Sequence, residues 1–146
     1  MKKFLLMLVC SLMSFASTYA QQKADDIVGV YKVVNGDDNS KVEIRKKGNG
    51  YRGQVIWLEN MKNKDGSPRT DAKNPDVSKR STPSDKIVLF EKLTFNAEKG
   101  EWGNGKIYDP TRGKFFNVKM LFKDTKTLKV TGSLGPFSKT VYWTKL

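Results

Sequence analysis

The fold is decided by a stretch at residues 41–58 that reads KVEIRKKGNGYRGQVIWL. In its first half Val42 and Ile44 alternate with charged residues, and this period of two places both apolar side chains on one face of a strand. Gly-Asn-Gly follows at residues 48–50, and such turn residues between two alternating segments indicate a β-hairpin. The second half is expected to be the partner strand, with three apolar residues on one side: Tyr51, Val55 and Trp57.

The rest of the chain repeats this pattern of short alternating strands and turns. At residues 114–122 every second residue is apolar, and a turn sequence, Asp-Pro-Thr-Arg-Gly, precedes this segment at residues 109–113. No convincing helical period is present. Eight strands are predicted in all, joined mostly by tight turns: 27–34, 41–45, 51–58, 86–95, 101–108, 114–122, 127–133 and 139–144.

Eight such strands predict an all-β fold, a single antiparallel up-and-down (meander) β-barrel with one long loop. The alternative is a β-sandwich, but one of immunoglobulin type needs Greek-key crossings and commonly a Cys…Trp…Cys pattern that this sequence lacks. A barrel of this size either fills its interior with side chains or keeps room for one small ligand. The sequence leaves both possibilities open.

The first twenty residues are expected to be a signal peptide rather than part of the fold. Lys2 and Lys3 form a short basic start, residues 4–15 an apolar run, and Ala20 ends a small-residue cleavage site. The alternatives are a retained membrane anchor, for which the run is short, and a lipoprotein acylated at Cys10, which bulky Val9 disfavours. The prediction is a periplasmic or secreted protein whose single barrel domain spans residues 21–146.

Composition excludes several classes of chemistry for the exported chain. The 27 Lys and Arg residues against 15 Asp and Glu give a net charge of +12, and cleavage would remove two lysines and no acidic residue, leaving +10. Since the sequence has no His and its one cysteine is Cys10, residues 21–146 have neither. Disulfides, thiol nucleophiles, Ser-His triads and the common zinc sites are therefore excluded. We expect no cofactor, no metal and no enzymatic activity.

The long loop, residues 59–85, is the exception to the tight turns. It is either a solvated surface excursion or a structured loop that closes one end of the barrel. Asn74-Pro75-Asp76 fixes a turn in it. The structured alternative predicts that Arg80 ties the loop down by pairing with the carboxylate of Asp76 or Asp109. The full set of expected clamp residues is Asp71, Asn74, Asp76, Arg80 and Asp109.

Several of these residues carry a family resemblance. The Asn-Pro-Asp loop at residues 74–76 with Arg80, the Ile-Tyr-Asp-Pro turn at residues 107–110 and the tryptophans Trp102 and Trp143 resemble an exported bacterial family, domain of unknown function 2147 (DUF2147). The resemblance covers the chain from residue 29 to its end. It implies a lipocalin-like (calycin) barrel and supplies no reaction. Residues 77–80 and 83–86 are more polar than the corresponding segments of the family.

Two groups of oxygen-bearing side chains are candidate chemical sites. Asp71, Asn74 and Asp76 offer oxygen ligands that suit calcium, but the spacing and the glycine of an EF-hand loop are absent. Asp76, Asp109 and Glu91 supply carboxylates of the kind that glycoside hydrolysis needs in pairs, and nothing in the sequence sets their separation. A hydrolase is therefore the third choice of function.

Glu91 breaks the apolar face of its predicted strand. It stands between Leu89 and Leu93, where alternation requires an apolar residue. Either a β-bulge turns Glu91 outward, or it meets a polar group inside a ligand cavity. The second interpretation predicts a barrel that binds a small apolar or amphiphilic envelope molecule through five residues: Trp57, Glu91, Trp102, Phe116 and Trp143.

The basic residues support an alternative function. Eleven of them fall on outward-facing or turn positions of the predicted strands: Lys41, Arg45, Lys46, Lys47, Arg52, Lys114, Lys119, Lys123, Lys126, Lys129 and Lys139. A cationic exterior attracts polyanions, so the protein is alternatively an accessory that binds anionic envelope polymer. Nucleic acid is not an expected partner, because the chain is predicted to be exported and has no recognised binding motif.

Overall fold

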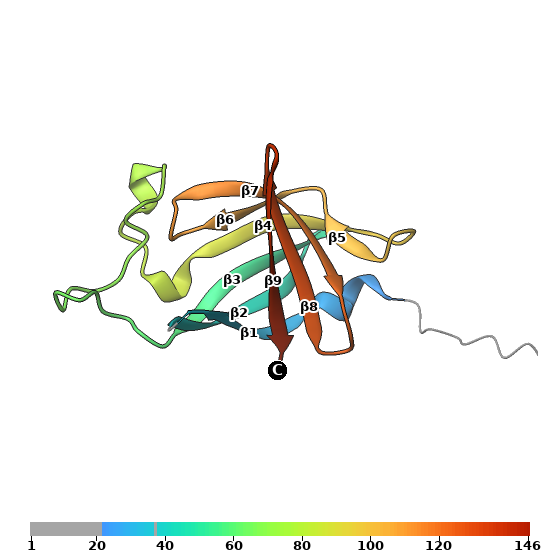
Figure 1. Cartoon of the computed structure of the whole chain (residues 1–146), viewed down its shortest axis with the longest axis horizontal. Helices are drawn as coiled ribbons and strands as arrows, with labels where there is room; N and C mark the ends of the chain where they lie inside the picture. The colour runs from blue at the N-terminus through green and yellow to red at the C-terminus, as the bar shows by residue number, and fades with distance from the viewer. Residues whose placement is uncertain (1–21, 37) are drawn as a thin grey trace, which may run out of the picture.

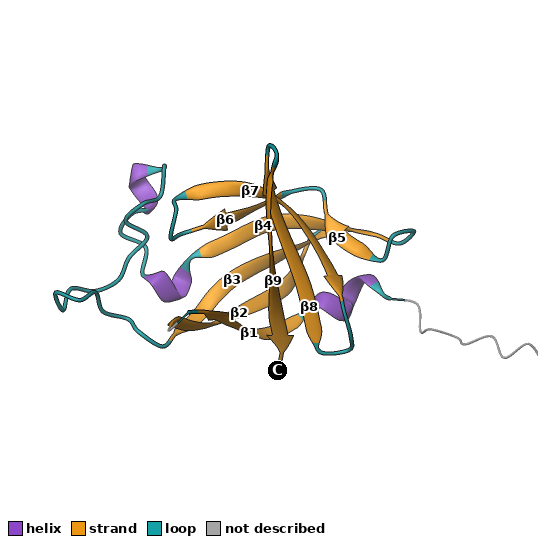
Figure 2. Cartoon of the chain, viewed as in Figure 1, coloured by secondary structure: helices purple, strands orange, loops and turns teal. Residues whose placement is uncertain are grey.

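The computed structural model describes residues 22–36 and 38–146, so the predicted signal peptide lies outside the described residues. The described chain forms one antiparallel sheet, with three short 3-10 helices beside it (Figures 1 and 2). The strands are β1 (Gly29–Asn35), β2 (Asp38–Lys47), β3 (Gly50–Leu58), β4 (Val88–Asn96), β5 (Glu101–Gly103), β6 (Lys106–Asp109), β7 (Lys114–Phe122), β8 (Thr127–Leu134) and β9 (Phe137–Lys145). The helices are η1 (Ala24–Ile27), η2 (Val77–Lys79) and η3 (Ser84–Lys86). No helix among the described residues is long and apolar enough to cross a bilayer.

The sheet closes into a barrel. Strands adjacent in sequence pair with one another except β5 and β6, the first strand β1 pairs with the last strand β9, and β5 pairs with both β4 and β7. The ring of strands is therefore closed, with β6 paired to β7 alone, and the meander barrel predicted from the sequence is confirmed. The sandwich is not the fold.

One predicted strand is divided in two. Residues 101–108 were expected to be continuous, but Asn104 has a φ of 59° and ends β5, and β6 begins two residues later. Gly105 lies at this break, where a Cβ atom would stand 2.9 Å from the carbonyl oxygen of Lys92 in β4. The left-handed residue and the close backbone approach let β5 pair with β4 while β6 pairs with β7.

Bulges change which side chains face inward along β3 and β4. In β3 the register shifts by one residue, because Lys41 pairs with Trp57 whereas Val42 pairs with Val55. The extra residue turns Trp57 outward, and 42% of it is exposed. In β4, Leu93 pairs with Tyr51 and Phe90 with Gly53, so one residue too many lies between them, and Glu91 is exposed. The bulge was the correct explanation for Glu91.

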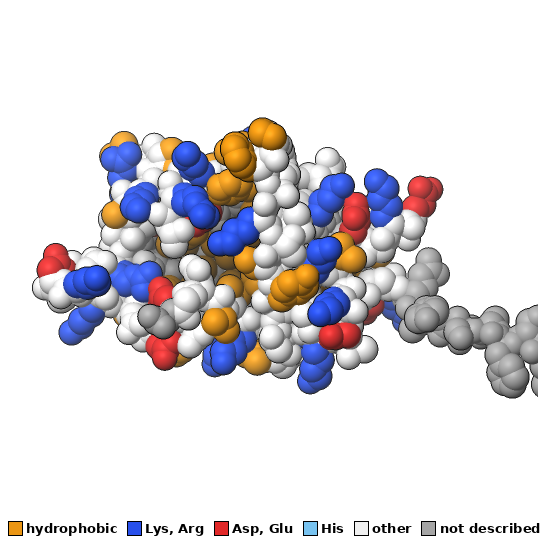
Figure 3. All heavy atoms as spheres, in the orientation of Figure 1, with side chains coloured by type: hydrophobic (Ala, Val, Ile, Leu, Met, Phe, Trp, Pro, Cys, Tyr) orange, Lys and Arg blue, Asp and Glu red, His pale blue; other side chains and the backbone are white. Residues whose placement is uncertain are grey.

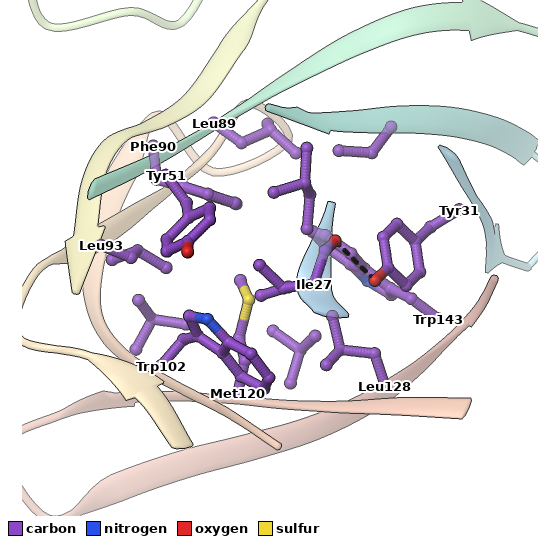
Figure 4. Packing of buried hydrophobic residues seen from close by; sticks show 14 of the residues in the cluster. Ile27, Tyr31, Tyr51, Leu89, Phe90, Leu93, Trp102, Met120, Leu128 and Trp143 are labelled. Atoms are coloured by element: carbon purple, nitrogen blue, oxygen red, sulfur yellow. Dashed lines mark hydrogen bonds between the residues drawn. The ribbon is translucent and has the colours of Figure 1, made fainter. Parts of the chain in front are cut away.

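Helix η1 closes one end of the barrel. Ile27 is fully buried at the centre of the core, and Figure 4 shows it surrounded by side chains from both halves of the sheet. The Tyr31 hydroxyl donates to the Ile27 carbonyl at 2.7 Å, and the Trp102 indole donates to the Ala24 carbonyl at 2.9 Å. The Tyr51 hydroxyl donates to Asp25, and burial followed by this hydrogen bond raises the pKa of Tyr51 to about 12. The helix is thus held by both packing and hydrogen bonds.

Candidate functional site

The opposite end of the barrel is hollow. A cavity of about 610 Å³ opens there, between the β1–β2, β6–β7 and β8–β9 turns and the long β3–β4 loop. Its inner wall is apolar and is contributed by strands all round the barrel: Val42, Val55, Leu89, Val130, Val141 and Trp143. Such a volume and lining are typical of small-molecule sites, which occupy about 300 to 1,000 Å³. The choice that the sequence left open is therefore settled in favour of a partly empty barrel.

Charged side chains stand at the mouth of this cavity. Asp38 pairs with Arg69 at 2.8 Å and Asp109 pairs with Arg112 at 2.8 Å. Burial opposes the ionisation of Asp109, but hydrogen bonds from Thr111 and Arg112 outweigh it and hold the pKa of that carboxyl below its ordinary value. Two more cations line the mouth, Lys114 in β7 and Lys139 in β9.

The long loop, residues 59–87, is structured and is anchored beside the mouth by Asp71. Only 3% of Asp71 is exposed, and it accepts hydrogen bonds from the Tyr108 hydroxyl and from the Asn74 amide, each at 2.7 Å. Burial and then the bond to Asp71 raise the pKa of Tyr108. On the facing β6–β7 turn, a side chain at Gly113 would collide with the Lys73 carbonyl, so the loop and the turn approach closely. Figure 1 shows the loop at the left and η1 at the right, at opposite ends of the barrel.

The predicted carboxylate clamp of Arg80 is wrong. The Arg80 Nε donates to the backbone carbonyl of Asn74 at 2.7 Å, within the loop itself. The Asp76 carboxylate is engaged at the start of η2, where it accepts from the backbone and hydroxyl of Ser78. Asp109 pairs with Arg112, three residues away. Local partners satisfy both carboxylates, and the buried Asp71 is what joins the loop to the barrel.

The five predicted ligand residues fall into three places. Phe116 and Trp143 line the cavity, as expected. Trp102 is fully buried in the closed-end core, packed against the tilted ring of Phe95 with ring centroids 4.7 Å apart. Trp57 lies outside the barrel, where the Lys41 ammonium stands 5.3 Å from its ring. The cavity prediction for Glu91 is wrong.

Glu91 lies on the outer face, near the β2–β3 turn. It accepts from Lys47 at 2.9 Å and lies 3.4 Å from Arg52. The Lys47 hydrogen bond is the main reason that the pKa of Glu91 is lowered. The three carboxylates considered for hydrolysis are therefore not brought together, since Glu91 lies outside the barrel and Asp109 at its mouth. Among the described residues no cluster of three His, Cys, Asp or Glu side chains is arranged to hold a metal ion.

Sequence reasoning missed the residues of the mouth, notably Asp38, Arg69 and the β8–β9 tip. A usable signal was available. In a meander, alternate turns lie at the same end of the barrel, so the turns after the first, third and later odd strands had to meet. At the tip, Leu134 and Phe137 pair with each other and are 46% and 78% exposed. Figure 3 shows orange hydrophobic side chains at this tip with blue basic ones near them.

On the face that Figure 3 shows, the basic side chains are dispersed. In Figure 3 lysine and arginine side chains are scattered over the face in view rather than gathered in one patch. Several are neutralised by acidic neighbours, including Arg45 by Glu43 and Lys46 by Asp25. A single continuous cationic face, which polymer binding would favour, is not seen in that view.

A closed meander barrel that is packed at one end and hollow at the other defines a lipocalin-like protein. The chain belongs to DUF2147, described as an uncharacterized protein conserved in bacteria, whose family model matches residues 29–145. It is also similar to a solved structure titled "Protein HP1028 from the human pathogen Helicobacter pylori belongs to the lipocalin family". That match has 26% identity, covers 82% of each chain and has a TM-score of 0.64. A search of curated proteins found no match.

Proposed function

We propose that this protein is a non-enzymatic, exported binding protein that holds one small apolar or amphiphilic molecule of the cell envelope. The observation that carries the proposal is the cavity of about 610 Å³ with its apolar inner wall. Hydrophobic side chains that line an empty space gain contacts when a ligand fills it, and the wall offers few polar groups to orient chemistry. The similarity to a lipocalin-family protein supports the same function.

A neutral fluorescent probe tests this function directly. We expect N-phenyl-1-naphthylamine to bind the delipidated protein saturably, with one site per chain. Val130→Phe places a larger side chain in the cavity wall and should weaken binding at least tenfold. Thr131→Phe is the matched control, since Thr131 is the next residue of β8 and its hydroxyl contacts that of Thr140 on the exposed surface. Circular dichroism checks that both variants fold.

Failure of the probe would favour the other function. If the delipidated protein shows no saturable binding, the carrier function is overturned, and binding of anionic envelope polymer through the basic exterior becomes the leading hypothesis.

Export is part of the proposal and rests on residues 1–20. Intact-mass measurement of protein from native envelopes should find a chain that begins at Gln21; a retained Met1 or an acylated Cys10 would contradict it.

A further inference from the structure

Among the described residues, the mouth of the cavity carries more basic side chains than acidic ones. Its lining includes four basic side chains and two acidic ones: Arg69, Arg112, Lys114, Lys139, Asp38 and Asp109. Both arginines are already paired with the two aspartates. Neither lysine has a carboxylate within 4 Å among the residues that the structure describes. Among the described residues, these two positive charges therefore have no acidic partner at the entrance to an apolar space.

The charges and the apolar wall are separated along the barrel axis. The wall residues lie inside the sheet, whereas Lys114 begins β7 next to the β6–β7 turn and Lys139 lies two residues beyond the start of β9. A low-dielectric wall beside two lysines that no described carboxylate pairs concentrates their field at the mouth. A ligand that matches both regions has an apolar chain and one negatively charged end.

We propose that the ligand is a single-chain amphiphile with an oxyanion head, a carboxylate or a phosphate monoester. This inference rests on the proposed function and names its ligand class. The apolar chain of the ligand fills the cavity between Trp143 and the mouth. Lys114 and Lys139 bind the head through charge-assisted hydrogen bonds, which are about twice as strong as neutral ones. The paired Arg69 and Arg112 define the rim against which the head lies.

A cationic head is the competing possibility, because one acidic oxygen at the mouth is unsatisfied. Asp38 Oδ1 is buried and has no hydrogen-bond partner among the described residues. That oxygen has almost no exposed surface, and the other oxygen of the same carboxylate is bound by Arg69. A ligand would have to displace protein atoms to reach it, whereas both lysines lie at the opening.

The test compares ligands that differ only in the head. Decanoate, decyl phosphate, decanol and decyltrimethylammonium displace N-phenyl-1-naphthylamine from the delipidated protein below their micelle-forming concentrations. We expect each anion to compete at least tenfold more tightly than decanol, and decyltrimethylammonium to be the weakest. The two anionic arms distinguish a fatty-acid head from a phosphate head. The anionic preference should shrink as salt is raised from about 10 mM to 1 M, because ions screen the mouth.

Charge-neutralising variants locate the head. In the double variant Lys114→Gln with Lys139→Gln, the affinity of each anion should fall to within about threefold of the affinity of decanol. The affinity of decanol itself should not change. Lys119→Gln with Lys126→Gln removes the same charge away from the cavity and should keep most of the preference. If decanol competes as well as the anions, or the preference survives the mouth variants, the anionic-head inference is overturned while the proposed function stands. If neither the probe nor any competitor binds, the proposed function itself fails.

Discussion

Both ends of this barrel are built from strands whose side chains alternate between the inside and the outside. The two ends differ in what fills the interior. At the closed end the inward positions carry large side chains, with Trp102, Leu93 and Met120 packed around Ile27 of η1 and fully buried. At the open end the inner wall includes several valines and Gly132 in β8 beside larger side chains such as Phe116, and the space that they enclose is empty. The comparison teaches that one end holds the fold together, whereas the other leaves the cavity on which the proposed function rests.

Trp143 marks the boundary between the two ends. Its ring contacts Tyr31 of the core with centroids 6.3 Å apart, and it also lines the cavity. The free energy of unfolding should therefore depend strongly on residues at the closed end, on one side of this tryptophan, and weakly on residues at the open end, on its other side. The three predictions that follow test that division, beginning with the largest expected effect.

Trp102→Ala at the closed end should destabilise the protein by about 3 to 5 kcal/mol. The change removes the packing against Phe95, the edge contact with Phe122 and the hydrogen bond to the Ala24 carbonyl that helps to hold η1. Urea unfolding followed by circular dichroism measures the loss. Phe137→Ala at the open end is the comparison and should change stability by less than about 0.5 kcal/mol, because Phe137 is 78% exposed. Equal losses at both ends would refute the division.

Asp71→Ala should have an intermediate effect, about 1 to 3 kcal/mol. It leaves the buried Tyr108 hydroxyl and the Asn74 amide without their acceptor. We expect the loss to appear first as local opening of residues 59–87, with faster hydrogen exchange at the Asp71 and Ser84 amides than at amides of the closed end. Asp65→Ala, which removes an exposed carboxylate of the same loop, should leave these amides protected. If exchange became faster at both ends together, the loop would open only when the whole barrel unfolds, and the two ends would not differ in stability.

Most of the fold follows from the sequence, because alternation and turn residues are local signals. The hairpin at residues 41–58 and the strand at 114–122 lie where the pattern predicts them. The errors come from single residues that shift the register. One bulge reverses the orientation of Trp57, another that of Glu91, and the left-handed Asn104 divides one strand into β5 and β6. A bulge depends on pairing between distant segments, and a one-residue shift moves side chains to the other face.

The candidate site was harder to predict than the fold. Phe116 and Trp143 were expected in the cavity from alternation, and they line it because no bulge shifts the pairing of β8 with β7 or β9. The inward face alone does not separate cavity from core, and Trp102 was assigned to the wrong one for that reason. The position along the barrel axis separates cavity-lining residues from core residues. Trp102 belongs to the core because η1 fills the end of the barrel where Trp102 lies. The alternation of residues in β5 does not predict that a helix from the N-terminal segment packs against Trp102.

Arg80→Ala should have the smallest effect of the three, less than about 1 kcal/mol. Arg80 is exposed, and its Nε makes one hydrogen bond, to the Asn74 carbonyl, rather than an ion pair that crosses to the barrel. Water can take over much of that contact, and the buried Asp71 continues to hold the loop. The measurement is the same urea unfolding and hydrogen exchange, with Lys79→Ala as a neighbouring control that should not change either. A loss as large as that of Asp71→Ala would mean that the arginine, not the aspartate, anchors the loop, and that the open end depends on a surface contact for its order.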